Sequence, residues 1–440
     1  MKKLSFRGGI HPLAKRHEGK AETSGKPIRD FVAECVCIPM DMHMGPPCKP
    51  CVQQGEHVKL GQVIGEAVGR FGIPAHASVS GVVTAVGPVQ QLRAQPSLCV
   101  TIRNDFKDEL AALEALGDVE SAPKHRIIPA IQAAGICGMG GAGFPTHAKL
   151  RLPEGKAVDT IILNGAECET FLTCDHRLML ESPGRIVDGL RAVMRAMGVA
   201  RGVIAIEDNK PDAIESMRRA AQGRDGVEVA VLKTKYPQGG EKQLVTAVTG
   251  REVPGGGLPM DARAVVINVG TAAAIADTVI EGKPLISRVT TVTGAVKDPS
   301  NLRLRVGTAF ADAIKSAGGY REAPGKIFAG GSMTGTCAPD DSVSATKGTN
   351  GIVTLTEREA DAAREIQCIR CGRCVMICPA RIMPYRLMEL YERGELNTAK
   401  QEHVKDCIQC GSCSYVCPSK RRLLPSIKSA IEQLARRRNR

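Results

Sequence analysis

The residues with the clearest chemistry are eight of the 17 cysteines, which lie between positions 368 and 417 in two repeats of identical spacing. In each repeat, two residues separate the first three cysteines from one another, and three residues separate the third from a fourth cysteine that precedes a proline. The first repeat consists of Cys368, Cys371, Cys374 and Cys378, and the second of Cys407, Cys410, Cys413 and Cys417. Three thiolates on one tight loop can ligate three irons of a cubane cluster, whereas the fourth ligand must approach from elsewhere.

This spacing is that of bacterial ferredoxins with two clusters, in which the fourth cysteine of each run ligates the other cluster. We therefore expect one 4Fe-4S cluster on Cys368, Cys371, Cys374 and Cys417, and a second on Cys407, Cys410, Cys413 and Cys378. The alternative is a pair of structural zinc sites, each built from two C-x2-C pairs. Zinc leaves no role for the third and fourth cysteines of each repeat or for the repeated Cys-Pro, so iron is favoured.

A glycine-rich loop is the second chemical signal. It contains Gly138, Gly140, Gly141 and Gly143 within six residues, followed by Phe144 and Lys149. Glycines at this density let backbone N–H groups converge on a phosphate, and a helix N-terminus favours the anion. The loop alone would also fit a flexible turn, because it lacks the spacing of a dinucleotide fingerprint or a Walker loop.

Three further blocks place polar residues directly after apolar segments. They contain Asn164 and Glu167, then Tyr236, Gly239 and Glu241, and finally Asn268. Strands are predicted at 160–163, 202–206, 228–232 and 264–269, with helices at 212–221 and 241–249 between them. Strands that alternate with helices form parallel sheets, and such sheets bind ligands at the carboxyl ends of their strands. The polar blocks are thus expected to meet at one edge.

The order of these blocks resembles the NADH-binding flavoprotein subunit of respiratory complex I and, more closely, the RnfC family, the C subunits of Rnf ion-translocating electron-transport complexes. Residues 6–12 (FRGGIHP) are similar to the N-terminal motif of the Rnf family, and so is the run from Asn164 to Met179. A module with two clusters also favours the Rnf family, because the complex I flavoprotein carries one cluster with different spacing.

The resemblance implies a multidomain α/β and β fold with four regions. Residues 1–110 would form a β domain of the biotinyl/lipoyl carrier shape, and residues 121–282 a Rossmann-like α/β domain for FMN and NADH. Residues 283–356 would form a small β-grasp domain of the SLBB type. Residues 357–440 would form a helical ferredoxin-like domain with a basic tail. Its residues 361–440 contain 16 Lys and Arg against eight Asp and Glu.

The resemblance also implies roles for the residues above. FMN would be held by the glycine-rich loop, with Lys149 near its phosphate and Asn164, Glu167 and Asn268 around the flavin. Phe144 and Glu241 would lie near NADH, and Tyr236 and Gly239 would complete the binding set. No catalytic side chain is expected, because the flavin carries the chemistry.

The family's function would be electron transfer between NAD(H) and ferredoxin through FMN and two 4Fe-4S clusters, coupled to ion movement by partner subunits. Integral-membrane and ferredoxin-like subunits would be the partners. Two alternatives are a soluble flavin/iron–sulfur reductase, such as the cobalamin reductases, and a docking subunit that only relays electrons between clusters.

The composition limits other functions. The chain has 440 residues, a net charge of +13, 3% aromatic residues and no Trp. Single-stranded nucleic acid is disfavoured, because its binding needs aromatic stacking platforms. No signal peptide is visible, and the most apolar stretch, 264–280, is interrupted by Asn268 and Asp277. We expect a peripheral protein at the cytoplasmic face of the inner membrane, attached through its partners.

Two groups of residues carry weaker signals. Cys35, Cys37, Cys48 and Cys51 could hold a soft metal, although small buried residues are the simpler interpretation. His43, His57 and His76 lack the paired spacing of a metal or catalytic site, so they are predicted to lie at the surface.

Overall fold

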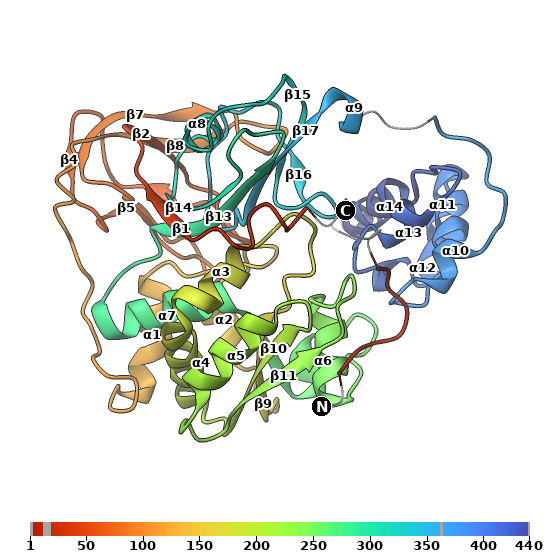
Figure 1. The fold of residues 1–440 in the computed structure, drawn as a ribbon, viewed down its shortest axis with the longest axis horizontal. Helices are drawn as coiled ribbons and strands as arrows, with labels where there is room; N and C mark the ends of the chain where they lie inside the picture. Colours follow the sequence, from red (N-terminus) through yellow and green to blue (C-terminus); the bar gives the residue numbers. More distant parts are fainter. Residues whose placement is uncertain (1–2, 12–18, 361–363, 439–440) are drawn as a thin grey trace.

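The computed structural model describes residues 3–11, 19–360 and 364–438 (Figure 1). Pro12 of the N-terminal motif and the last two residues of the basic tail therefore lie outside the described residues. Within these ranges, no helix combines the length and the apolar character that crossing a membrane requires.

A parallel four-stranded sheet in the order β11-β10-β9-β12 forms the centre of the α/β region. Its strands are β9 (Thr160–Gly165), β10 (Arg201–Glu207), β11 (Val227–Leu232) and β12 (Ala264–Asn268). Its helices are α1 (Lys124–Ala133), α2 (Thr146–Leu150), α3 (Cys174–Glu181), α4 (Pro183–Met197), α5 (Pro211–Ala221), α6 (Glu241–Thr249) and α7 (Val269–Glu281), with a 3-10 turn η1 at Pro259–Ala262. All four predicted strands and both predicted helices, α5 and α6, are present.

Helices cover both faces of this sheet because successive strand residues point to opposite sides and both sides are apolar. On one face, α4 and α7 pack over Ile161 and Leu163. On the other face, Leu244 of α6 belongs to the cluster around Ile162. With both faces covered, the loops at the carboxyl edge are left to bind ligands.

The N-terminal β region consists of two small sheets that enclose one core. The strands are β2 (Cys35–Pro39), β3 (Lys49–Pro50), β4 (His57–Val58), β5 (Val63–Glu66), β6 (Ala75–His76), β7 (Gly81–Val89) and β8 (Ser97–Asn104). The sheets have the orders β2-β8-β7-β4 and β3-β5-β6. Gly81 has a φ of 147°, and a Cβ there would lie 2.0 Å from the Arg103 carbonyl oxygen, so only glycine allows β7 to approach β8 here.

The third region is a six-stranded sheet in the order β1-β14-β13-β17-β15-β16. Its strands are β1 (Ile28–Phe31), β13 (Ser287–Gly294), β14 (Ser300–Arg305), β15 (Pro324–Ala329), β16 (Thr336–Cys337) and β17 (Gly351–Thr356), and its helix is α8 (Phe310–Ser316). β1 comes from the N-terminal part of the chain and pairs in parallel with β14. The N-terminal region and the third region are therefore joined by a shared sheet.

The C-terminal region is helical and repeats one unit twice. Its helices are α9 (Glu357–Ala360), α10 (Arg373–Met376), α11 (Pro384–Glu392), α12 (Leu396–Gln401), α13 (Ser412–Val416) and α14 (Leu423–Arg438), with a 3-10 turn η2 at Val404–Asp406. Each cysteine loop runs into a short helix, α10 or α13, and each Cys-Pro is followed by a longer one, α11 or α14. The longer helices pack together through Leu387, Leu390, Ile427 and Leu434.

Candidate functional site

The glycine-rich loop connects α1 to α2 and is closed at its base. The Gly138 amide donates to the Phe144 carbonyl at 2.9 Å, and Cys137 forms an isolated bridge with Pro145. At the tip, Gly140 and Gly141 are exposed, and a Cβ added to Gly141 would meet no protein atom within 4 Å. The tip is therefore free to receive a group from outside the protein.

Two contacts fix this loop to the elements beneath it. The Met139 amide donates to Thr271 Oγ1, near the start of α7, at 3.0 Å. Arg288 of β13 is buried, and its guanidinium donates to the carbonyls of Met139 and Lys347. The loop is thus attached both to the α/β region and to the six-stranded sheet.

Asn164 and Asn268 lie at the carboxyl ends of the neighbouring strands β9 and β12 and meet there, as predicted. They are paired in the register of β9 and β12. Asn164 Nδ2 donates to the Gly239 carbonyl at 2.8 Å, and Asn268 Nδ2 donates to Asp175 Oδ2 at 2.6 Å. A Cβ on Gly140 would lie 3.0 Å from Asn268 Nδ2, so the glycine-rich loop reaches this edge as well.

Glu167 takes an unusual backbone conformation with a φ of 44°. Its carboxylate accepts from the backbone amides of Asp175 at 2.7 Å and His176 at 3.1 Å, and so binds the N-terminus of α3. Among the described residues, Glu167, Cys174 and Asp175 are the one set of three potential metal ligands within 4.8 Å of one another. Burial, and then the Glu167 charge, raise the pKa of Asp175 to about 6.

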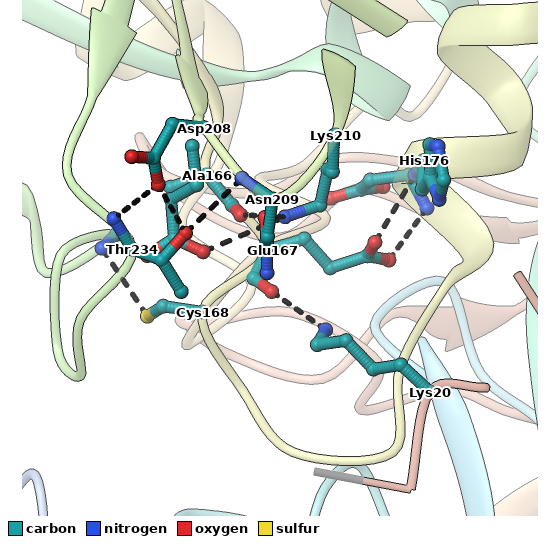
Figure 2. A network of polar contacts seen from close by, with 12 residues as sticks. Lys20, Ala166, Glu167, Cys168, His176, Asp208, Asn209, Lys210 and Thr234 are labelled. Carbon is teal, nitrogen blue, oxygen red and sulfur yellow. Dashed lines mark hydrogen bonds and ion pairs between the residues drawn. The ribbon is translucent and has the colours of Figure 1, made fainter. Parts of the chain in front are cut away.

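Two lysines beside Glu167, which the sequence did not single out, hold the backbone of this segment (Figure 2). Lys210 is buried; its Nζ donates to the Ala166 carbonyl at 2.7 Å and lies 3.5 Å from Glu207 Oε2. Lys20 Nζ donates to the Glu167 carbonyl at 2.8 Å, and burial lowers the pKa of this amine. Lysine in a polar loop is common in sequences, and no local pattern distinguishes these two.

The two predicted charged residues near the loop form an ion pair with each other. Lys149 of α2 contacts Glu241 at the start of α6, and both side chains are partly exposed. Phe144 packs against Phe71 of the N-terminal region, with ring centroids 5.9 Å apart. The two residues that follow the loop, Phe144 and Lys149, are thus held by Phe71 and by Glu241.

Tyr236 connects the α/β region to the cysteine-rich region. Its hydroxyl donates to the Cys410 carbonyl at 2.6 Å, and burial raises the pKa of this phenol. Its amide donates to the Ile10 carbonyl at 2.8 Å, and the neighbouring Gly9 amide donates to the Ile377 carbonyl at 2.7 Å. In Figure 1 this N-terminal segment, in red, runs beside the blue C-terminal region.

Seven of the eight cysteines of the repeats fall into two groups of neighbouring thiols. A cavity is lined by four of them, Cys378, Cys407, Cys410 and Cys413. Cys374, from the other group, is influenced by the charges of its neighbours Cys417 and Cys368. Burial raises the pKa of Cys407 to about 11 and of Cys413 to about 12. Thiols that must ionise to bind metal, gathered at an apolar cavity, suit a soft metal cluster.

The weaker sequence signals have different outcomes. Of Cys35, Cys37, Cys48 and Cys51, all of them described, no three have sulfurs within 4.8 Å of one another. The surface prediction is right for His57, which is exposed and pairs with Asp105 at 2.9 Å. It is wrong for His43 and His76, which are 5% and 2% exposed.

The region from 131 to 277 matches the family model of the Nuo51 FMN-binding domain, and residues 367–421 match a 4Fe-4S dicluster domain. Residues 4–107 match the RnfC barrel sandwich hybrid domain and residues 289–336 the SLBB domain. The C subunit of the Na(+)-translocating ferredoxin:NAD(+) oxidoreductase complex of Acetobacterium woodii is 44% identical over 436 residues, which cover 98% of this chain and 97% of that protein. This chain belongs to the RnfC family.

Other RnfC relatives are similar over most of their length. The C subunit of the proton-translocating ferredoxin:NAD(+) oxidoreductase complex of Clostridium ljungdahlii is 43% identical, over 91% of this chain and 87% of that protein. The C subunit of the ion-translocating oxidoreductase complex of Rhodobacter capsulatus is 39% identical, over 91% of this chain and 77% of that protein. The resemblance inferred from the motifs is thereby confirmed.

The RnfC fold is also similar to a solved structure. An NAD+-reducing [NiFe]-hydrogenase in the H2-reduced state matches with a TM-score of 0.51 at 19% identity, over 72% of this chain and 65% of that chain. At this identity the likeness concerns the fold alone. Together with the four family models, it confirms the predicted multidomain α/β and β architecture.

Proposed function

We propose that this chain is the peripheral RnfC component of an Rnf-type complex, which transfers electrons between NAD(H) and ferredoxin while partner subunits move ions. The names of the curated relatives support this activity. The complex would place the chain at the cytoplasmic face of the inner membrane. The four regions at 1–110, 121–282, 283–356 and 357–440 would act as its domains.

The residues at the carboxyl edge fit FMN. The glycine-rich loop would hold the phosphate, because its exposed tip offers backbone amides and Lys149 follows the loop on α2. Asn164, Glu167 and Asn268 would surround the ring, with Tyr236 and Gly239 beside them. Phe144 and Glu241 would contact the nicotinamide nucleotide. Bound flavin supplies exchange of a hydride with nicotinamide and of single electrons with iron–sulfur clusters.

The two thiol groups fit two clusters with exchanged ligands. One cluster would use Cys368, Cys371, Cys374 and Cys417, and the other Cys407, Cys410, Cys413 and Cys378. The four thiols around one cavity support the second set.

The observation that carries the proposal is the hydrogen bond from Tyr236 to the Cys410 carbonyl. It holds a residue of the predicted flavin site against a residue of the predicted cluster site. Electron transfer requires that the two sites be neighbours.

Anaerobic purification with iron and flavin analysis, followed by titration with NADH, tests the proposal. We expect two 4Fe-4S clusters and one FMN per chain, and bleaching of the flavin and cluster absorbance by NADH. Zinc in place of iron, or iron without flavin and without a response to NADH and added FMN, would contradict it.

A further inference from the structure

Residues 4–10 run from the α/β region to the cysteine-rich region, and we call this segment the N-terminal strap (Figure 1). At one end, Leu4 forms a parallel bridge with Leu232, the last residue of β11. At the other end, Ile10 and Tyr236 exchange two backbone hydrogen bonds of 2.8 Å. The strap is therefore attached to the α/β region on both sides of the point where it meets the cysteine-rich region.

Two glycines make this meeting point possible. The Gly9 amide donates to the Ile377 carbonyl at 2.7 Å. Gly8 has a φ of 79°, and a Cβ there would lie 3.0 Å from the carbonyl oxygens of both Ile377 and Cys378. Gly9 also has a φ of 79°, and its Cβ would lie 2.6 Å from the Tyr236 carbonyl oxygen. Both the backbone conformation and the available space therefore require glycine at these two positions.

The strap contacts the backbone of the one cysteine that is expected to ligate the cluster of the other repeat. Cys378 belongs to the first repeat, yet it lines a cavity together with Cys407, Cys410 and Cys413 of the second. The Tyr236 hydroxyl donates to the Cys410 carbonyl at 2.6 Å, and the Tyr236 backbone is bonded to the end of the strap. Two sides of this thiol group are thus held by one connected set of contacts.

The close contact between Gly8 and the Cys378 carbonyl keeps water away from that side of the ligand. The gap between them is too narrow for a methyl group, and hence for a water molecule. Reduction adds negative charge to an iron–sulfur cluster, and water near the cluster stabilises that charge. Because the reduction potential depends on solvent exposure, loosening the strap should raise the potential of the cluster that Cys378 ligates.

We propose that the N-terminal strap is a positioning element for the second cluster, and that Gly8 and Gly9 help to set the reduction potential of this cluster by holding the Cys378 backbone in place and away from water. This inference rests on the proposed function, because it requires iron at these thiols. It assigns a role to the glycines of the motif at 6–12, although they precede Cys378 by about 370 residues.

Redox titration of the anaerobically purified full chain, followed by electron paramagnetic resonance, tests the role of the strap. The signal that Cys410→Ser alters identifies the second cluster. In Gly8→Ala, the ratio of reduced to oxidised second cluster at a fixed potential should rise about 10-fold, which corresponds to about 59 mV for one electron. The ratio for the first cluster should stay within about 2-fold. Gly25→Ala is the matched control and should change neither ratio, because Gly25 is exposed, lacks a positive φ and has no atom within 4 Å of an added Cβ.

Phe6→Ala provides a second variant that leaves both glycines in place. Lys235 Nζ donates to the Phe6 carbonyl at 2.8 Å and lies 4.4 Å from the centre of the Phe6 ring, so removal of the ring loosens the strap. Amide exchange in residues 4–10 should become about 5-fold faster, and the reduced-to-oxidised ratio of the second cluster should rise about 3-fold. Unchanged ratios in both variants, or an equal change in both clusters, would overturn the role of the strap. A wild-type protein without two 4Fe-4S signals would instead overturn the proposed function itself.

Discussion

Gly140 and Gly141 are neighbours in the predicted phosphate loop, yet their surroundings predict opposite effects of the same substitution. A Cβ on Gly140 would lie 3.0 Å from Asn268 Nδ2 and 3.1 Å from Asn268 Cβ. A Cβ on Gly141 would meet nothing within 4 Å. Neither residue has the positive φ that alanine avoids, so backbone strain does not enter the comparison.

For the flavin-free protein, Gly141→Ala should raise the free energy of unfolding by about 0.4–1 kcal/mol, because alanine restricts the unfolded chain. Gly140→Ala gains the same amount but must displace Asn268. That side chain makes hydrogen bonds of 2.6 Å with Asp175 and 2.8 Å with Gly270, each with a net value of about 0.5–1.5 kcal/mol. Gly140→Ala should therefore destabilise the protein by about 1 kcal/mol.

For flavin binding, the expectation at Gly141 reverses. The added methyl group occupies the open space in which the phosphate is proposed to lie, so Gly141→Ala should weaken FMN binding at least 10-fold, or about 1.4 kcal/mol. Calorimetry of the flavin-free protein measures the stability, and quenching of FMN fluorescence measures the affinity. If Gly141→Ala binds FMN with wild-type affinity, the phosphate is not bound at this loop tip. If Gly141→Ala loses as much stability as Gly140→Ala, the space around Gly141 is not open.

Three other predictions concern ligand exchange, the contact between regions and pH. The double variant Cys378→Ser/Cys410→Ser should keep as much iron as either single variant, because both thiols are assigned to the same cluster. Loss of all iron in the double variant would show that Cys378 does not bind the cluster of the second repeat. Tyr236→Phe should speed amide exchange in residues 407–413 about 5-fold by removing a hydrogen bond of about 1 kcal/mol, and unchanged exchange in mass spectrometry would contradict this. The folded state raises the pKa of Asp175 from 3.8 to about 6, so folding stability falls as the pH rises through that window. The gain in Tm produced by Asp175→Asn should therefore grow between pH 4 and pH 7. A gain in Tm that does not depend on pH would contradict the pKa shift.

The parallel sheet could be predicted from the sequence because its strands are short apolar runs with clear ends. Gly202–Ile206 was expected as a strand, and β10 spans Arg201–Glu207. The same logic predicted that Asn164 and Asn268 meet, since both lie at the carboxyl ends of strands of one parallel sheet. Local pattern and regular topology are sufficient in these cases.

The errors and omissions arise where distant segments pack together. His76 is buried near Lys347, which lies about 270 positions further along the chain, so the local sequence around His76 could not predict this contact. The pairing of β1 with β14 is equally distant in sequence. Lys210 lies in a polar loop that is typical of an exposed turn, yet tertiary packing buries it. Spacing within a motif does not contain this information.

The segment around Gly9 has a consequence for biosynthesis. The Ile377 carbonyl, which accepts from the Gly9 amide, is synthesised 368 residues after Gly9. At a translation rate of about 5–20 residues per second, this is a delay of roughly 20–70 s. β1 likewise waits for β14. Other partners of this segment, such as Tyr236 for Ile10, are made about halfway through synthesis. The start of the nascent chain therefore completes its native contacts only after most of the polypeptide has been translated, and the metal-binding region must emerge before the molecule can close.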